Sequence, residues 1–214
     1  MIEFPASTKI HRRLPKESFY KRLSLSQELK DKFVSDVERI VVENSLSMQS
    51  LNLEKESEIT EIMLLSISLK KQDFDSKLIE AIAKQNPHKL VFLLTYEDKS
   101  QLAVYHKKLH RTQWINTDDI SLKLSGFSID EIWESFVEQI AIHDENAKSA
   151  ADLSIEQRLA LQEDIAKLEK LIKRTEAAAW KEKQPKKKFE LYSKLTEYRK
   201  KLEDLLKLGI RNEE

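Results

Sequence analysis

The chain has 214 residues, with 37 Lys and Arg, 37 Asp and Glu, and no formal net charge at pH 7. This length suffices for one domain of ordinary size plus an appendage. The charge balance excludes a general attraction to nucleic acid or membrane, so an electrostatic partner must be recognised by local patches. The absence of cysteine and the presence of only two glycines exclude disulfides, thiolate metal sites, phosphate-cradling loops and G-x-S-x-G turns.

The same composition argues for a cytoplasmic protein. No apolar run approaches the ~20 residues that span a bilayer, so no contact with a membrane is expected. The first residues lack the charged and apolar regions of a signal peptide, and a chain without cysteine suits a reducing compartment. No cofactor is expected.

The N-terminal part of the chain predicts two helices. Residues up to Leu14 are expected to be irregular, and a helix is expected from Pro15 to about Leu23, since proline suits the first turn. Ser26 is expected to begin a second helix, in which Glu28 in the first turn favours the helix dipole.

Two strands and a loop are predicted next. The β-branched residues between Val37 and Ser45 indicate a strand, and the polar stretch 47–57 indicates a loop. Residues 58–69 are almost continuously apolar, which is typical of a central strand.

The middle of the chain predicts a helix and a β-hairpin. Apolar residues from Phe74 to Ile82 have helical spacing, which ends at Asn86-Pro87. Residues 90–96 indicate a second buried strand, and 101–107 indicate its antiparallel partner after a turn.

Short strands, a helix and a linker are expected after this hairpin. The strands are placed around 112–114 and at 120–124. Ser128 and Glu131 have the spacing of a capping box for the helix. The polar, alanine-rich segment that follows predicts a linker.

Residues 154–208 predict two long helices folded back on each other. Apolar residues recur at spacings of four and three in both arms, which is the pattern of a coiled coil. Pro185 suits the start of a second helix, so the basic segment 181–188 is predicted to be the tip. The predicted seam consists of Leu161, Ile165, Leu168, Ile172, Thr175, Ala179, Leu191, Leu195, Tyr198, Leu202 and Leu205.

These elements together predict an α+β fold. A mostly antiparallel sheet with flanking helices is followed by a C-terminal antiparallel coiled-coil helical hairpin. The expected division is a globular domain at 1–143, a linker at 144–153 and the hairpin at 154–208.

Six stretches carry a resemblance to a known family: Phe4-Pro5, 15–20, 61–65, 90–99, the Trp114 segment and the tip at 181–191. They resemble a prokaryotic family catalogued as domain of unknown function 4391, and the tip is the most specific of them. The resemblance implies no catalytic residues. It implies partners, namely helicase or methyltransferase subunits of restriction-like and phage-defence systems. In that family a lysine often precedes the pair that stands here as Leu46-Ser47, where this chain has Ser45.

Two constellations suggest metal chemistry. His106 and His110 have the i, i+4 spacing that holds a metal on a helix, but the pattern predicts a strand, on which the rings stand roughly 13 Å apart. No metal site is expected there. Asp75, with Asp73 as an alternative, could join Glu97 and Lys99 in a Mg²⁺-dependent nuclease site, although Glu97 and Lys99 fall where the chain must turn.

Local basic patches are the remaining signal. Trp180, Phe189 and Tyr192 flank the tip lysines, so cationic and aromatic groups could together meet phosphates and bases. Alternatively, the lysines serve solubility and the aromatics close the end of the seam. The candidate nucleic-acid-binding residues are Arg12, Arg13, Lys108, Arg111, Lys181, Lys183, Lys186, Lys187 and Lys188.

The sequence therefore predicts a non-catalytic accessory protein of a DNA restriction-modification or phage-defence complex. Its hairpin tip is expected to contact nucleic acid, DNA or RNA, or a partner protein. The alternative is a metal-dependent nuclease that uses Asp75, Glu97 and Lys99. A third reading, a structural dimer formed through the coiled coil, predicts no affinity for nucleic acid.

Overall fold

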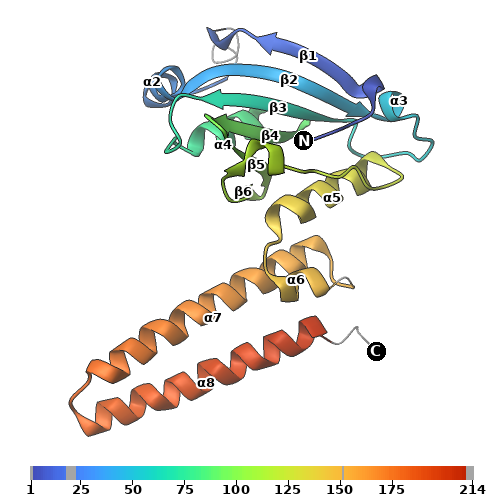
Figure 1. Ribbon diagram of the computed structural model, residues 1–214. Helices are drawn as coiled ribbons and strands as arrows, with labels where there is room; N and C mark the ends of the chain where they lie inside the picture. Colours follow the sequence, from blue (N-terminus) through green and yellow to red (C-terminus); the bar gives the residue numbers. More distant parts are fainter. Residues whose placement is uncertain (1, 18–22, 151, 211–214) are drawn as a thin grey trace. The chain divides into compact units, whose positions relative to one another are not determined.

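The computed structural model describes residues 2–17, 23–150 and 152–210 of the chain. The chain divides into two compact units, Met1–Ala141 and Ile142–Glu214 (Figure 1). The first unit combines a sheet with helices, and the second is helical. No helix within the described ranges is both long and apolar enough to cross a lipid bilayer.

A single mixed sheet organises the first unit. Its order is β1-β2-β3-β4-β5-β6, with β7 paired to β5 beside this path. Only the β3–β4 pair is parallel among these neighbours, which confirms the mostly antiparallel α+β prediction. The strands are β1 (Lys9–Leu14), β2 (Val37–Ser47), β3 (Glu61–Leu69), β4 (Lys89–Tyr96), β5 (Lys99–His106), β6 (Lys108–Arg111) and β7 (Ile115–Asn116).

Helices of the first unit connect and cover these strands. The longest are α2, α4 and α5, and the others are single turns. The helical segments are η1 (Ala6–Thr8), α2 (Gln27–Asp36), α3 (Met48–Leu51), α4 (Lys77–Gln85), η2 (Thr117–Asp119) and α5 (Ile129–Ala141).

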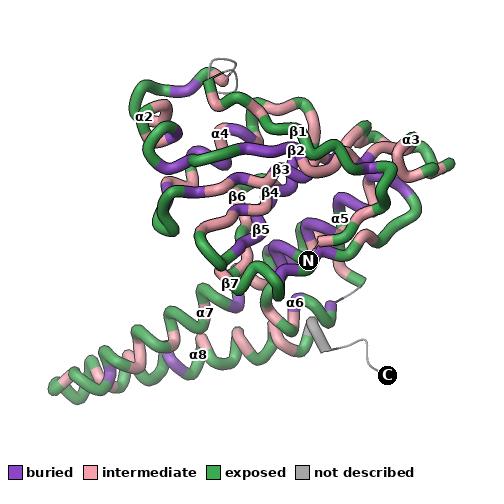
Figure 2. The backbone as a smooth tube through the Cα atoms, turned by 45° about the horizontal axis from the view of Figure 1, so that its top comes forward, coloured by how far each residue is buried: buried purple, intermediate pink, exposed green. Residues whose placement is uncertain are grey.

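Side chains that alternate along the strands build a core on each face of the sheet. On one face, Leu65 and Phe92 pack in a cluster with Phe33 of α2 and Ile79 of α4. Helix α5 contacts β3, β5 and β6, and its buried side chains lie outside that cluster. It therefore covers the other face. Figure 2 shows buried residues concentrated in this unit, along the strands and α5.

Polar side chains set the helix starts that the sequence predicts. The Ser26 hydroxyl accepts a hydrogen bond from the backbone N–H of Leu29 at 3.3 Å, and Ser128 accepts one from Glu131 at 3.2 Å. The Glu131 carboxylate accepts from the N–H of Phe127 instead of closing a full capping box. Both helices thus begin with a satisfied N–H in the first turn.

The N-terminal segments differ from the sequence prediction. Residues 9–14 form the edge strand β1, whose mostly polar and mostly exposed side chains lack the apolar alternation of a buried strand. The expected loop 47–57 contains α3, which Ser47 caps through a capping box with Ser50. For the helix predicted at 15–23, residues 18–22 lie outside the described part of the chain.

The strands expected at 112–114 and 120–124 do not occur there. The chain reverses at Lys107, whose φ is 59°, so the additional strands are β6 and β7. Along 120–124, Gln139 of α5 takes the place of a neighbouring strand. Its side chain accepts from the N–H of Lys123 and donates to the Lys123 carbonyl, both at 2.9 Å.

A buried carboxylate connects α2 to the loop before α4. Asp36 is 1% exposed and accepts hydrogen bonds from Lys71 at 2.8 Å and Ser35 at 2.6 Å. Burial alone would raise the pKa of Asp36, but these hydrogen bonds and one from the N–H of Asp75 hold it below the ordinary value of 3.8. The folded protein therefore favours the ionised form.

This pKa shift predicts a loss of stability in acid. Asp36 binds a proton more readily in the unfolded chain, so its contribution is present above about pH 4 and is lost as pH falls through the folded pKa. We expect Asp36→Asn to lower the free energy of unfolding by about 1–3 kcal/mol at neutral pH. Urea titrations at neutral pH and near pH 3 should show a smaller acid loss for the variant, and an unchanged acid loss would contradict this role.

The second unit is a helical hairpin with a short helix at its root. It comprises α6 (Glu145–Ser149), α7 (Ile155–Lys181) and α8 (Pro185–Ile210). Three residues connect the two long helices, and the contacts of Leu161 and Ile165 with Leu202 and Leu205 show that they run antiparallel. This confirms the predicted helical hairpin.

The segment expected to be a linker, 144–153, contains helix α6, which packs on α7 and α8. Asp144 caps α6 by accepting from two backbone N–H groups. Arg158 of α7 is 5% exposed and donates to the carbonyls of Ala147 at 2.7 Å and Lys148 at 3.0 Å. These bonds satisfy carbonyls at the C-terminal end of α6.

Candidate nucleic-acid interface

The tip of the hairpin gathers the predicted basic cluster on one short reversal. Helix α7 ends at Lys181 and α8 begins at Pro185. Four of the five tip lysines are exposed, and Lys188 is partly exposed. Within the described residues, none of these five lysines forms an ion pair. Their ammonium groups are therefore available to an external anion.

Aromatic side chains beside these lysines also face solvent. Trp180 is 76% exposed and Phe189 is 73% exposed, while Tyr192 is 43% exposed. Ala179, directly before Trp180, is fully buried and fills the seam at this level. The alternative in which the aromatics close the end of the seam is therefore wrong for Trp180 and Phe189.

The seam itself follows the predicted spacing. Every predicted seam position is buried or partly buried, and the flanking positions are mostly exposed. The buried members are Leu161, Ile165, Ala179 and Leu195. The two arms therefore satisfy their apolar stripes against each other within one chain.

Charge is segregated along the chain in a way that the zero net charge hides. Residues 166–200 contain twelve Lys and Arg but only five Asp and Glu, which gives a formal charge of +7. Because the whole chain sums to zero, the remaining residues carry −7. The distal part of the hairpin is therefore a concentrated cationic surface.

The other predicted basic residues belong to the sheet unit. Arg12 and Arg13 lie on β1 and Lys108 and Arg111 lie on β6, which are opposite edges of the sheet. The Arg111 guanidinium stacks 5.6 Å from the ring centre of Phe74. All four belong to the first unit, whereas the tip lysines belong to the second.

The two histidines considered as metal ligands are not on one continuous strand. β5 ends at His106, and β6 returns from Lys108. The chain thus folds back, and Nε2 of His110 lies 3.3 Å from the carbonyl oxygen of His106. The premise of an extended strand is wrong because Lys107 reverses the chain.

Two residues of the nuclease hypothesis, Asp75 and Glu97, come after the C-terminal ends of β3 and β4, which lie on the same side of the sheet because these strands run parallel. Lys99 is the first residue of β5. Asp75, however, pairs with Lys32 at 2.6 Å and accepts from the N–H of Lys77 at 3.0 Å. The hydrogen bond from Lys32 contributes most to lowering the pKa of Asp75. Glu97 lies in the β4–β5 turn with φ 52°, and Lys99 pairs with Tyr96 across that turn.

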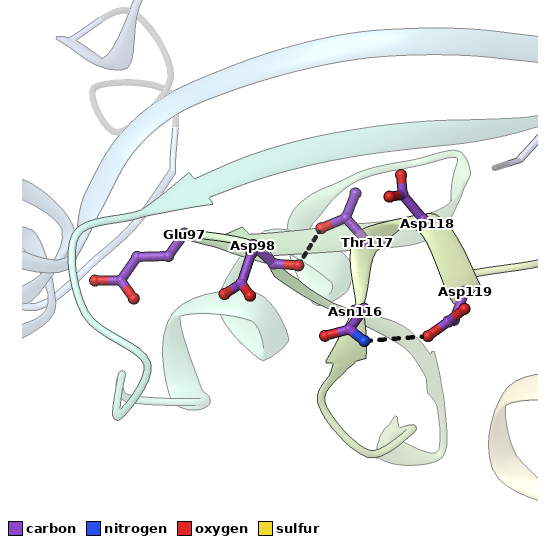
Figure 3. A pocket seen from close by; sticks show the side chains of 6 residues that line it. All are labelled: Glu97, Asp98, Asn116, Thr117, Asp118 and Asp119. Carbon is purple, nitrogen blue, oxygen red and sulfur yellow. Dashed lines mark hydrogen bonds between the residues drawn. The ribbon is translucent and has the colours of Figure 1, made fainter.

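An open acidic pocket lies beside this turn. Its lining residues are Glu97, Asp98, Asn116, Thr117, Asp118 and Asp119. Figure 3 shows the carboxylates of Glu97 and Asp118 pointing away from those of Asp98 and Asp119. Thr117 donates to the Asp98 carbonyl and Asn116 to the Asp119 carboxylate. The carboxylates of this pocket repel phosphate.

A family model described as domain of unknown function (DUF4391) matches residues 2–202. The chain belongs to the DUF4391 family. No curated protein and no solved structure matches it.

Ser45 is the position where the resemblance to the DUF4391 family leads us to expect lysine. Its hydroxyl donates to the carboxylate of Glu61 on the neighbouring strand. The other carboxylate oxygen of Glu61 lies 3.2 Å from Nδ1 of His88. Serine thus makes a neutral contact where a lysine would bring a positive charge next to Glu61.

Sequence reasoning found the tip of this DUF4391 hairpin but missed two features. One is the charge segregation, which counting Lys and Arg against Asp and Glu along the helices would have shown. The other is the exposure of the aromatic rings. The sequence did contain a signal for this exposure, because a residue directly after a seam residue points away from the seam. Trp180 follows Ala179 in this way, and Tyr192 follows Leu191.

Proposed function

We propose that this protein is a non-catalytic accessory protein that binds nucleic acid through the tip of its helical hairpin. The single observation that carries this proposal is the cluster of five accessible lysines beside exposed Trp180 and Phe189. Lysine contacts with phosphates release counterions and supply affinity. Exposed aromatic rings offer apolar area that a monomeric protein has little reason to present to water.

A nucleic-acid ligand explains the composition of the tip better than a protein partner does. Lysine is depleted in protein–protein interfaces, where arginine and aromatic residues are enriched. The +7 region from 166 to 200 contains ten lysines and two arginines. A flexible ammonium group suits contact with a phosphate backbone as a point charge.

The cellular setting is proposed from the resemblance to the family. A cytoplasmic restriction-modification or phage-defence complex, with a helicase or methyltransferase subunit, would bring nucleic acid to the hairpin. In this proposal α7 and α8 interdigitate as an intramolecular coiled coil, so no second copy is needed to cover their apolar stripes. The hairpin then acts as an arm about 40 Å long, at ~1.5 Å per residue of α7.

Replacing Lys186, Lys187 and Lys188 together with Gln tests this function. If three phosphate contacts are lost, the slope of log affinity against log salt should flatten by about 2. Affinity near 0.1 M salt should fall by roughly 10–100-fold. Fluorescence anisotropy with a labelled oligonucleotide over a series of salt concentrations measures both quantities.

A charge-matched control separates the site from net charge. The triple change of Lys9, Lys99 and Lys123 to Gln removes the same charge from exposed positions of the sheet unit. We expect it to preserve affinity and salt slope nearly in full. If the tip variant and this control bind alike, or if the wild-type protein binds no nucleic acid, the proposed function is wrong.

A further inference from the structure

The exposed aromatics of the tip lie on one side of the hairpin. Trp180 directly follows the seam residue Ala179, and Tyr192 directly follows the seam residue Leu191. In two antiparallel right-handed helices that face each other, the residues directly after seam positions lie on the same side of the pair. Phe189, three residues before Tyr192, shares its helix face.

An ion pair between the helices fixes this assignment. Glu176 directly follows the seam residue Thr175, and Arg199 directly follows the seam residue Tyr198. Their side chains meet at 3.0 Å across the hairpin. The residues after seam positions therefore do share one side of this hairpin, which we call the aromatic side and define by Trp180, Phe189 and Tyr192.

The opposite side has a different character. Residues directly before seam positions include Asp164 and Lys167 on α7, which form an ion pair at 3.0 Å. Glu197 and Lys201 on α8 pair at 2.7 Å. Ion pairs thus occur on both sides, and what distinguishes the aromatic side is its exposed rings. A ligand that stacks on these rings must therefore approach from the aromatic side.

We infer that the ligand of the tip is single-stranded nucleic acid, with unpaired bases stacked on Trp180 and Phe189 and phosphates held by the tip lysines. This inference rests on the proposed function and specifies its substrate. A base in a duplex is already stacked on its neighbours and offers no free face to a ring on a helix surface. An unpaired base offers such a face whatever its identity, so aromatic rings beside a basic track suit single strands.

The test compares a single-stranded oligonucleotide with a duplex of equal length, using the full chain and fluorescence anisotropy. The wild-type protein should bind the single strand more tightly. The double variant Trp180→Ala, Phe189→Ala should lose roughly 5–100-fold in single-strand affinity for each stacked base. Its duplex affinity should change little. Since both rings are exposed, the variant should fold as the wild type does.

Leu171→Ala is the matched control, because Leu171 is 40% exposed and lies on the side opposite the aromatic side, directly before the seam residue Ile172. It should leave single-strand affinity unchanged. Trp180 fluorescence gives a second readout, since stacking on a base should quench it in the wild type and a Trp180→Phe variant should lose that quenching.

Two outcomes overturn this inference while leaving the proposed function intact. One is duplex binding as tight as single-strand binding in the wild type. The other is a double variant that keeps single-strand affinity although the Lys186, Lys187 and Lys188 variant loses it. If the wild-type protein binds neither oligonucleotide, the proposed function itself fails and this inference fails with it.

Discussion

Phe92→Ala is expected to lower the free energy of unfolding of the sheet unit by about 3–5 kcal/mol. Phe92 lies on the central strand β4, is fully buried and packs with residues of α2 and α4. Removing the ring loses its burial from water and leaves a cavity that close-packed neighbours fill only in part. Domains are typically stable by only about 5–15 kcal/mol, so this change removes a large share of that stability.

Urea unfolding measures this effect, with Trp114 and Trp133 of the sheet unit as reporters in a Trp180→Phe background. The urea midpoint should fall, and the slope of free energy against urea should stay constant if both proteins unfold from the same folded state. Val34→Ala is the control, because Val34 is 53% exposed and should change stability by less than about 0.5 kcal/mol. Equal midpoints for the two variants would contradict the central position of β4.

Arg158→Ala is expected to destabilise the hairpin unit by about 3–5 kcal/mol. Its hydrogen bonds to the carbonyls of Ala147 and Lys148 each involve a charged donor, and such bonds contribute about 1.5–3 kcal/mol. Without the guanidinium, the carbonyls of Ala147 and Lys148 lose their partner at the end of α6. The apolar cluster at the hairpin root is small, centred on Ala150, Leu161 and Ile165, so little other burial compensates.

Hydrogen exchange along α7 and α8 provides the measurement for Arg158. Protection should fall across both helices, and most at their root. The matched control is Arg174→Ala, since Arg174 is exposed on the same helix and should leave protection nearly unchanged. Unchanged exchange in the Arg158 variant would show that α6 is not required for the stability of the hairpin.

Local periodicity made two elements predictable from the sequence. The near-continuous apolar run gave β3, and the alternating four and three spacing gave the positions of the seam between α7 and α8. Both signals depend on burial of neighbouring residues within one segment. The tip followed from Pro185 and the lysines around it, because proline is favoured at the first position of a helix.

Elements whose backbone partners are distant in sequence were not predictable in this way. β1 is exposed, so its side chains carry no alternation, and its strand character comes from pairing with β2. Residues 120–124 alternate between apolar and polar like a strand, but the side chain of Gln139 bonds the backbone N–H and carbonyl of Lys123, which would otherwise pair with a neighbouring strand. The parallel pairing of β3 and β4 likewise could not be predicted from the sequence. It places Asp75 and Glu97 after the C-terminal ends of neighbouring strands.

The position of β1 and β6 at the two ends of the sheet has a consequence for behaviour in concentrated solution. An edge strand presents unpaired backbone groups that can template pairing with another molecule. A protein with no net charge also lacks the overall repulsion that keeps molecules apart. β1 and β6 carry basic residues and no acidic ones, so an approach of two copies along these strands brings like charges together. Local repulsion at the two edges thus opposes the sheet-to-sheet aggregation that the neutral composition alone would permit.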